Sequence, residues 1–244
     1  MVYTLSNYSY SFIRRLRELA TPLEAYNLQI ADIDTTCHLK PLQTLTNDNS
    51  VYGYSIDFDQ NTVTDIESPH AYVDITNSTL LAANGIKFHH LTSDTFDTRI
   101  FNHFLLKPNS VEFANCFLDA TLIHNVKQRI QTQPTIIKLD HCVCDPNYTI
   151  TVMLECFPFC KTLRLRGSVN FVLSNFIVTD FRSLFTKNSM EFFAFLEITE
   201  GNATWTDLNS LLDDFEDSNS EKTDDLVIIL HHEVRYFRFK PLIV

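Results

Sequence analysis

The centre of the chain repeats one short arrangement of apolar positions at a fixed interval. Each set has two apolar residues separated by one position, followed three positions later by a small residue: Val111/Phe113/Cys116, Ile137/Leu139/Cys142 and Leu163/Leu165/Ser168. Each set begins 26 residues after the previous one. Alternation of apolar and polar residues is typical of a strand with one buried face. The pattern therefore predicts three equivalent short strands.

A repeat of this length predicts how those strands are arranged. Leucine-rich repeats have units of similar length, each with one strand and one helix, and the units stack because none can bury its apolar face alone. We therefore expect an α/β fold, a leucine-rich-repeat-like solenoid of the ribonuclease-inhibitor type with a curved parallel sheet. The expected single domain covers 1–244, with an N-terminal helix or cap in 1–24, repeats in 25–230, the most regular repeats in 86–168, and a C-terminal cap in 231–244.

Weaker patterns predict further elements on both sides of the centre. Apolar residues with helical spacing predict a helix over Ser11 to Ala20 that ends before Pro22, and further helices after Asp119, after Asp145 and Pro146, and near Thr179 to Thr186. Further strands are predicted around 28–33, 54–59, 86–91, 193–198 and 226–230, a capping box at Thr204 and Asp207, an insertion around Tyr72 to Ile75, and an exposed acidic loop over Asp213 to Asp225.

Composition and charge restrict the classes of partner. Hydrophobic residues make up 45% of the chain, including twenty Phe, which is ample material for a folded core. The net charge of -11 argues against binding to nucleic acid or to an anionic membrane, both of which favour clustered Lys and Arg. No apolar run has the length of a signal peptide or a membrane span. We therefore expect a cytoplasmic or nuclear protein with reduced cysteines.

A cluster of soft ligands is the main candidate for chemistry. It consists of a histidine and four cysteines close together in sequence: His141, Cys142, Cys144, Cys156 and Cys160. These residue types bind zinc, but paired C-x-x-C motifs are missing, and Cys142 already occupies the small-residue position of the repeat. We interpret the cysteines as buried structural thiols and expect no cofactor. A small enzyme or zinc-binding domain that uses His141 and the nearby cysteines is the alternative.

The polar positions between the repeated apolar residues indicate a binding surface. If the apolar residues face inward, alternation places two rows outward, Glu112/Lys138/Arg164 and Ala114/Asp140/Arg166. These charges could pair across adjacent strands, which contributes little energy. They could instead form a concave surface for a protein partner. The candidate partner-binding residues are Glu112, Lys138, Asp140, Arg164 and Arg166.

The repeats resemble a known class of protein. Over Ile86 to Ser168 they are similar to the cysteine-containing leucine-rich repeats of F-box proteins, and Val178 to Phe185 and Thr204 to Leu212 more distantly resemble the F-box-associated repeats of nematodes. In that family the repeats hold a substrate while an F-box recruits a ubiquitin ligase. Ser11 to Ala20 supplies only one helix, so the three-helix F-box is not recognisable. The resemblance implies a non-enzymatic protein-interaction module, the substrate-recognition part of a ubiquitin-ligase adaptor, with ligase components among its partners.

Overall fold

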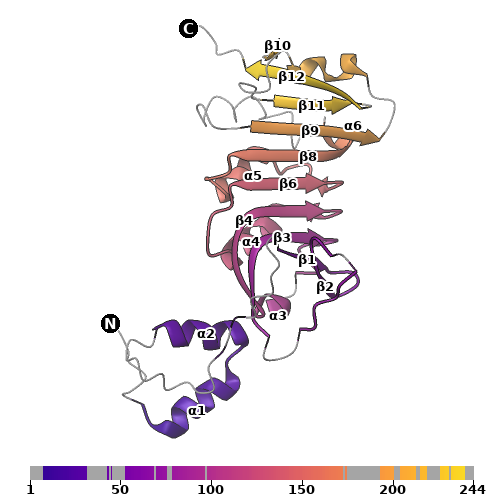
Figure 1. Ribbon diagram of the computed structural model, residues 1–244. Helices are drawn as coiled ribbons and strands as arrows, with labels where there is room; N and C mark the ends of the chain where they lie inside the picture. The colour runs from indigo at the N-terminus through magenta and orange to yellow at the C-terminus, as the bar shows by residue number, and fades with distance from the viewer. Residues whose placement is uncertain are drawn as a thin grey trace, which may run out of the picture.

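The computed structural model shows a long mixed sheet with a pair of helices at its N-terminal end (Figure 1). The described residues are 8–31, 43, 45, 53–68, 70–75, 79–96, 98–172, 174, 193–200, 204–212, 215–218, 226–230 and 232–239.

Ten described strands form the main sheet. They are β1 (Tyr54–Asp57), β2 (Thr62–Asp65), β3 (Leu81–His89), β4 (Phe104–Ala114), β6 (Ile136–Asp140), β8 (Thr162–Ser168), β9 (Phe193–Glu200), β10 (Phe215–Ser218), β11 (Leu226–Leu230) and β12 (Glu233–Phe239). Their order is β10-β12-β11-β9-β8-β6-β4-β3-β1-β2. The pairs from β1 and β3 to β9 and β11 are parallel, whereas β1 with β2, β11 with β12 and β10 with β12 are antiparallel. Two short strands, β5 (Phe117–Leu118) and β7 (Val143–Cys144), form a separate parallel pair.

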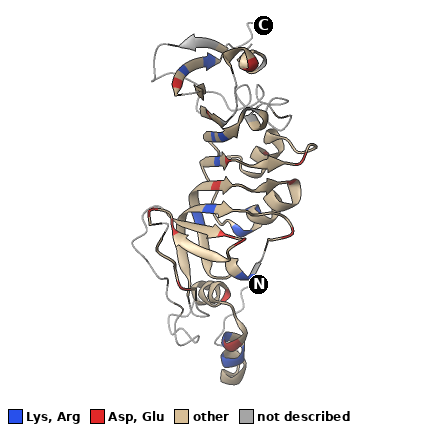
Figure 2. Ribbon diagram, turned by 90° about the vertical axis from the view of Figure 1, so that its right-hand side faces the viewer, with Lys and Arg blue, Asp and Glu red and all other residues tan. Residues whose placement is uncertain are grey.

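The described helices are few and mostly short. They are α1 (Tyr10–Leu19), α2 (Pro22–Ala31), α3 (Thr98–Phe101), α4 (Ala120–Arg129), α5 (Ile150–Cys156), α6 (Val169–Val172), the 3-10 helix η2 (Trp205–Leu208) and α9 (Asn209–Leu212). Helices α4 and α5 pack together, and their buried residues belong to the same apolar cluster as the inward residues of the strands. Figure 2 shows helices on one side of the strands and charged strand residues on the other.

The predicted leucine-rich-repeat-like solenoid is wrong. The sheet is mixed rather than purely parallel, and strands outnumber helices. Among the described helices that lie between strands, only α4 and α5 exceed four residues. The physical reason is that the 26-residue interval reports how often a strand recurs, and it does not require a helix in each connection. The expected single domain over 1–244 stays a prediction.

The predicted register of the central strands is confirmed. Val111 pairs with Ile86 on one side and Ile137 on the other, and Ile137 pairs with Leu163. Phe113, Leu139 and Leu165 form the next buried row of the same sheet. Equal spacing in sequence has therefore placed equivalent residues side by side, and both rows lie in one continuous core.

A column of unusual backbone conformations ends these strands. His90, Asn115 and His141 have positive φ values of 56°, 52° and 50°, and Gly167 occupies the same place after β8. The His90 amide donates to Ala114 O, that of Asn115 to Asp140 O, and that of His141 to Arg166 O, at 2.8 to 3.1 Å. Each turn therefore bonds to the next strand, and the chain direction changes at the same level in successive units.

A glycine allows β1 to approach β3. Gly53 has a φ of 119°, and a Cβ added there would lie 1.9 Å from the carbonyl oxygen of Gly85. Gly85 follows an irregularity in the pairing of β3 with β4. Only a residue without a side chain fits this contact, so Gly53 fixes where the first parallel strand joins the sheet.

The N-terminal helices differ from the prediction in one respect. The first helix is confirmed as α1, with its N-cap at Ser9. Pro22 does not stand outside a helix, because it is the first residue of α2, a position that suits its missing N–H. Thr21 and Glu24 cap α2 reciprocally, and the Thr21 amide donates to the Glu24 carboxylate at 2.9 Å. The strand expected around 28–33 is therefore wrong for residues 28–31.

Other expected elements had mixed outcomes. Asp119 caps α4 as predicted, and β11 is the expected buried strand. The helix predicted after Asp145 and Pro146 begins only at Ile150, with Thr149 as its cap. The acidic segment is not all loop, because Phe215 is buried and begins β10. The helix expected near 179–186, Cys37 and His231 lie outside the described residues.

Candidate functional site

The five predicted partner-binding residues lie together on the open face of the sheet, which we define as the outward side chains of β3, β4, β6, β8 and β9. Glu112 pairs in register with Lys87 and Lys138, and Lys138 pairs with Arg164. Asp140 pairs with Arg166 in the neighbouring row. Blue and red bands mark these strands in Figure 2, on the side away from the helices. The alternation argument therefore placed all five correctly on one face.

Glu112 is held between two lysines. Its Oε1 lies 2.6 Å from Lys87 Nζ, and its Oε2 lies 3.5 Å from Lys138 Nζ. All three side chains are partly shielded from solvent, with 24%, 19% and 36% of Lys87, Glu112 and Lys138 exposed. These charges satisfy one another across the strands, as the pairing interpretation expects. They contribute modestly to stability, because such exposed or half-exposed pairs are worth less than about 1 kcal/mol.

The second row has looser pairs. Arg166 Nε lies 3.6 Å from Glu197 Oε2, and His141 Nε2 lies 3.6 Å from Asp140 Oδ1. That Asp140 oxygen is shielded from solvent and makes no hydrogen bond within the described structure. Arg166 keeps 54% of its side chain exposed. Its guanidinium therefore retains donors that a further molecule can use.

Arg164 is the most available cation of the face. It is exposed, and none of the described acidic residues forms an ion pair with it. Its guanidinium carbon lies 5.8 Å from the centre of the Phe195 ring, within reach of a cation–π interaction. An arginine beside an aromatic ring is a common combination at the centre of protein interfaces.

The open face becomes apolar beyond Arg164, which the sequence interpretation missed. In register with Phe195 are Val227 of β11 and Tyr236 of β12. Phe195 and Tyr236 are partly exposed, and none of the three belongs to the main apolar cluster or packs against it. Phe195 follows Arg164 by 31 residues rather than 26, so the repeat interval could not locate it. Alternation within β9 was the only available signal.

A separate group of charges lies at the β1 end of the face. His90 Nδ1 lies 3.3 Å from Asp57 Oδ1. Burial opposes ionisation of Asp57, but hydrogen bonds from the Gln60 amide and His90 prevail and lower its pKa. Burial, with Lys87 nearby, lowers the pKa of His89. Asp57 is therefore charged and His89 neutral at pH 7.

The candidate zinc ligands are not brought together as a site. Within the described ranges, no three His, Cys, Asp or Glu side chains are placed to hold one metal ion. The Cys142 thiol is buried and donates to Phe113 O at 3.2 Å, and the equivalent Cys116 thiol donates to Phe88 O at 3.3 Å. Burial raises the pKa of Cys142 and raises that of Cys144 to about 12. These environments favour neutral thiols, whereas zinc binds thiolates.

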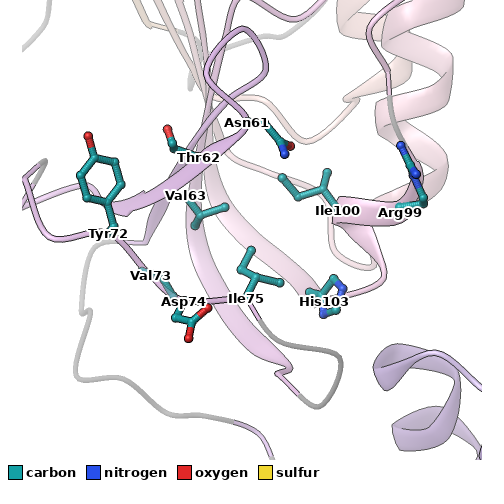
Figure 3. Close-up of a pocket in the computed structure, with 10 residues that line it drawn as sticks. All are labelled: Asn61, Thr62, Val63, Tyr72, Val73, Asp74, Ile75, Arg99, Ile100 and His103. Carbon is teal, nitrogen blue, oxygen red and sulfur yellow. The ribbon is translucent and has the colours of Figure 1, made fainter.

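A pocket near the β2 end of the sheet was not predicted. It has a volume of about 670 Å³ and is formed by three segments: Asn61 to Val63, Tyr72 to Ile75, and Arg99, Ile100 and His103. In Figure 3, Val63, Ile75 and Ile100 point toward one another, whereas Tyr72 and Asp74 point outward. The Val73 amide donates to Val63 O at 2.8 Å, which fixes the predicted insertion against β2. Three segments distant in sequence form this pocket, so no local motif could indicate it.

Comparison with known proteins gives no relative from which a function could be transferred. No protein-family model, curated protein or solved structure matches the chain. None of the helices in the described part of the chain has the length and apolar character needed to cross a bilayer.

Proposed function

We propose that the protein is a non-enzymatic binding protein that holds a protein partner on the open face of its sheet. The observation that carries this proposal is the exposed pair Arg164 and Arg166 on β8. Arg164 lies over Phe195 and has no acidic partner among the described residues, so it is available for a carboxylate from outside the chain.

The neighbouring strands supply the other features of an interface. Lys138 and Glu112 form a paired, polar border on one side of Arg164. Phe195 and Tyr236 supply partly exposed aromatic surface on the other side. An apolar centre with arginine and a polar rim is typical of protein interfaces. The expected partner therefore places an acidic side chain at Arg164 and apolar side chains over β9 and β11.

The cellular role stays a proposal at a coarser level. We place the protein in the cytosol or nucleus, where thiols stay reduced, because its five described cysteines are free. A link to ubiquitin-ligase components rests on the sequence resemblance alone, and binding on the open face does not depend on it.

Site-specific photocrosslinking tests the surface directly. A benzoylphenylalanine in place of Phe195 is expected to crosslink one recurrent protein in native lysate, which mass spectrometry then identifies. The same probe in place of Val152, which is exposed on α5, serves as the control for random contact. Equal crosslinking of the same proteins from both positions would contradict the proposal.

Affinity measurements with the identified partner then test the arginines. Arg164→Ala combined with Arg166→Ala is expected to weaken binding at least tenfold, since interface arginines often cost about 2 kcal/mol or more when truncated. Arg14→Ala combined with Arg15→Ala removes two equally exposed arginines from α1 and should leave affinity unchanged. Normal binding by the β8 variant would show that the open face is not the recognition surface.

A further inference from the structure

The pocket beside β2 differs from the open face in shape and chemistry. Its volume of about 670 Å³ falls within the range of roughly 300 to 1,000 Å³ that small-ligand sites occupy. Its lining combines aliphatic side chains with one arginine, one histidine, one aspartate and one asparagine. A site of this kind can both bury an apolar group and orient a polar one.

The aliphatic part of the pocket continues the protein core. Val63 is buried, and Val73, Ile75 and Ile100 are partly buried and pack against the main cluster. Figure 3 shows Val63, Ile75 and Ile100 converging on the middle of the pocket. Because these side chains are held by the core, they offer a fixed apolar surface of a size suited to a leucine-like side chain.

His103 has its hydrogen-bonding roles fixed by the backbone. Its Nδ1 lies 3.0 Å from the carbonyl oxygen of Thr79, which can only accept, so Nδ1 carries the proton. In the neutral ring Nε2 is then an acceptor. His103 can therefore accept a hydrogen bond from an N–H or O–H group of a ligand.

Arg99 supplies positive charge to the same pocket. It belongs to α3, one residue before Ile100, and lies beyond Ile100 in Figure 3. A guanidinium has five N–H donors, so it can bind a ligand carboxylate in addition to its contacts within the protein. Asp74, the acidic residue of the lining, points away from the middle and leaves the charge near Ile100 positive.

We propose that this pocket binds a carboxy-terminal aliphatic residue with an acylated nitrogen, either as an N-acyl amino acid or as the end of a peptide. The carboxylate contacts Arg99, the amide N–H donates to His103, and the side chain packs against Val63, Ile75 and Ile100. This is an activity separate from binding on the open face.

Matched small probes test each part of the proposal on the unaltered protein. N-acetyl-leucine is expected to bind with a Kd of about 1 mM, in keeping with its few non-hydrogen atoms, and to perturb the amide NMR signals of residues 61–63 and 99–103. N-acetyl-leucinamide, which lacks the carboxylate, and N-acetylglycine, which lacks the side chain, should bind at least tenfold more weakly. Equal binding of the amide, or perturbation elsewhere in the chain, would overturn the proposal.

Variants and one longer probe complete the experiment. Arg99→Gln should weaken N-acetyl-leucine at least tenfold, and Ile100→Trp should fill the pocket and abolish binding, with folding checked by circular dichroism. Arg164→Gln and Val152→Trp make the same changes elsewhere and should have no effect. If acetyl-Ala-Ala-Ala-Leu binds tenfold tighter than N-acetyl-leucine, the ligand is a peptide end; equal affinity identifies the free N-acyl amino acid. Unchanged affinity in a folded Arg99→Gln variant would refute the assignment.

Discussion

At the scale of single residues, adjacent positions on one strand have opposite roles. Leu165 is fully buried in the core, whereas Arg164 and Arg166 on either side are exposed on the open face. Burial of an aliphatic side chain stabilises the fold, but an exposed charge contributes little. Residues next to each other in sequence should therefore separate stability from recognition.

Urea unfolding of purified variants measures that separation. Leu165→Ala should lower the free energy of unfolding by about 2 to 5 kcal/mol, because it removes buried methyl groups and leaves a cavity. Arg164→Ala combined with Arg166→Ala should change it by less than about 1 kcal/mol. A large loss in the double variant would assign the arginines a structural role and weaken the proposed function.

A buried thiol should make stability depend on pH in the alkaline range. Burial raises the pKa of Cys160 from an ordinary value of 9.0 to about 11. The unfolded chain therefore loses this proton first, so the contribution is intact below pH 9 and is lost as pH rises toward 11. The free energy of unfolding of the wild type should fall by roughly 1 to 2 kcal/mol over this interval relative to Cys160→Ala. Parallel pH profiles for the two proteins would contradict the expected shift.

At the scale of elements, the turn that follows each central strand depends on one strained residue. Asn115 adopts a φ of 52°, which asparagine and glycine tolerate and β-branched residues do not. Asn115→Val should destabilise the protein by about 1 to 2 kcal/mol, whereas Asn115→Gly should be close to neutral. Thermal melts of the two variants give the comparison. Equal loss in both would mean that the Asn115 side chain, rather than its backbone, matters.

The central strands could be predicted because the same local pattern recurs there without interruption. Alternation also placed Glu112 and Arg164 on one face, since the period of a strand is two residues wherever it lies. Connections were harder to predict. Asp145 and Pro146 have the chemistry of a helix start, but the Asp145 carboxylate accepts from the Asn147 amide in a local turn, and α5 begins later.

Features formed by distant segments could not be predicted from local patterns. Pro22 is compatible with the end of one helix or the start of another, and only its capping partners resolve which. The contact of Arg164 with Phe195 depends on a connection of irregular length between β8 and β9. The pocket at Ile100 depends on how the segment around Val73 attaches to β2.

At the scale of the whole molecule, the sheet gives each of its two faces a separate task. The helix-covered face holds the continuous core, and the open face carries the charged rows and the apolar surface that extends from Phe195. Small-ligand binding at the pocket and protein binding at β8 use different residues. Variants of Arg99 and of Arg164 should therefore affect only their own ligand.

The equal spacing of Val111, Ile137 and Leu163 also makes the chain divisible in phase. Removing residues 113–138 joins Glu112 to Leu139, so that Leu139 takes the buried position of Phe113 and Cys142 that of Cys116. We expect this shortened protein to fold, with β4 paired directly to β8, and to melt cooperatively below the wild type. Removing only residues 113–137 joins Glu112 to Lys138 and forces a lysine into that buried position, which should abolish cooperative melting. Like a ladder with evenly spaced rungs, the sheet can lose a complete interval but not a fraction of one.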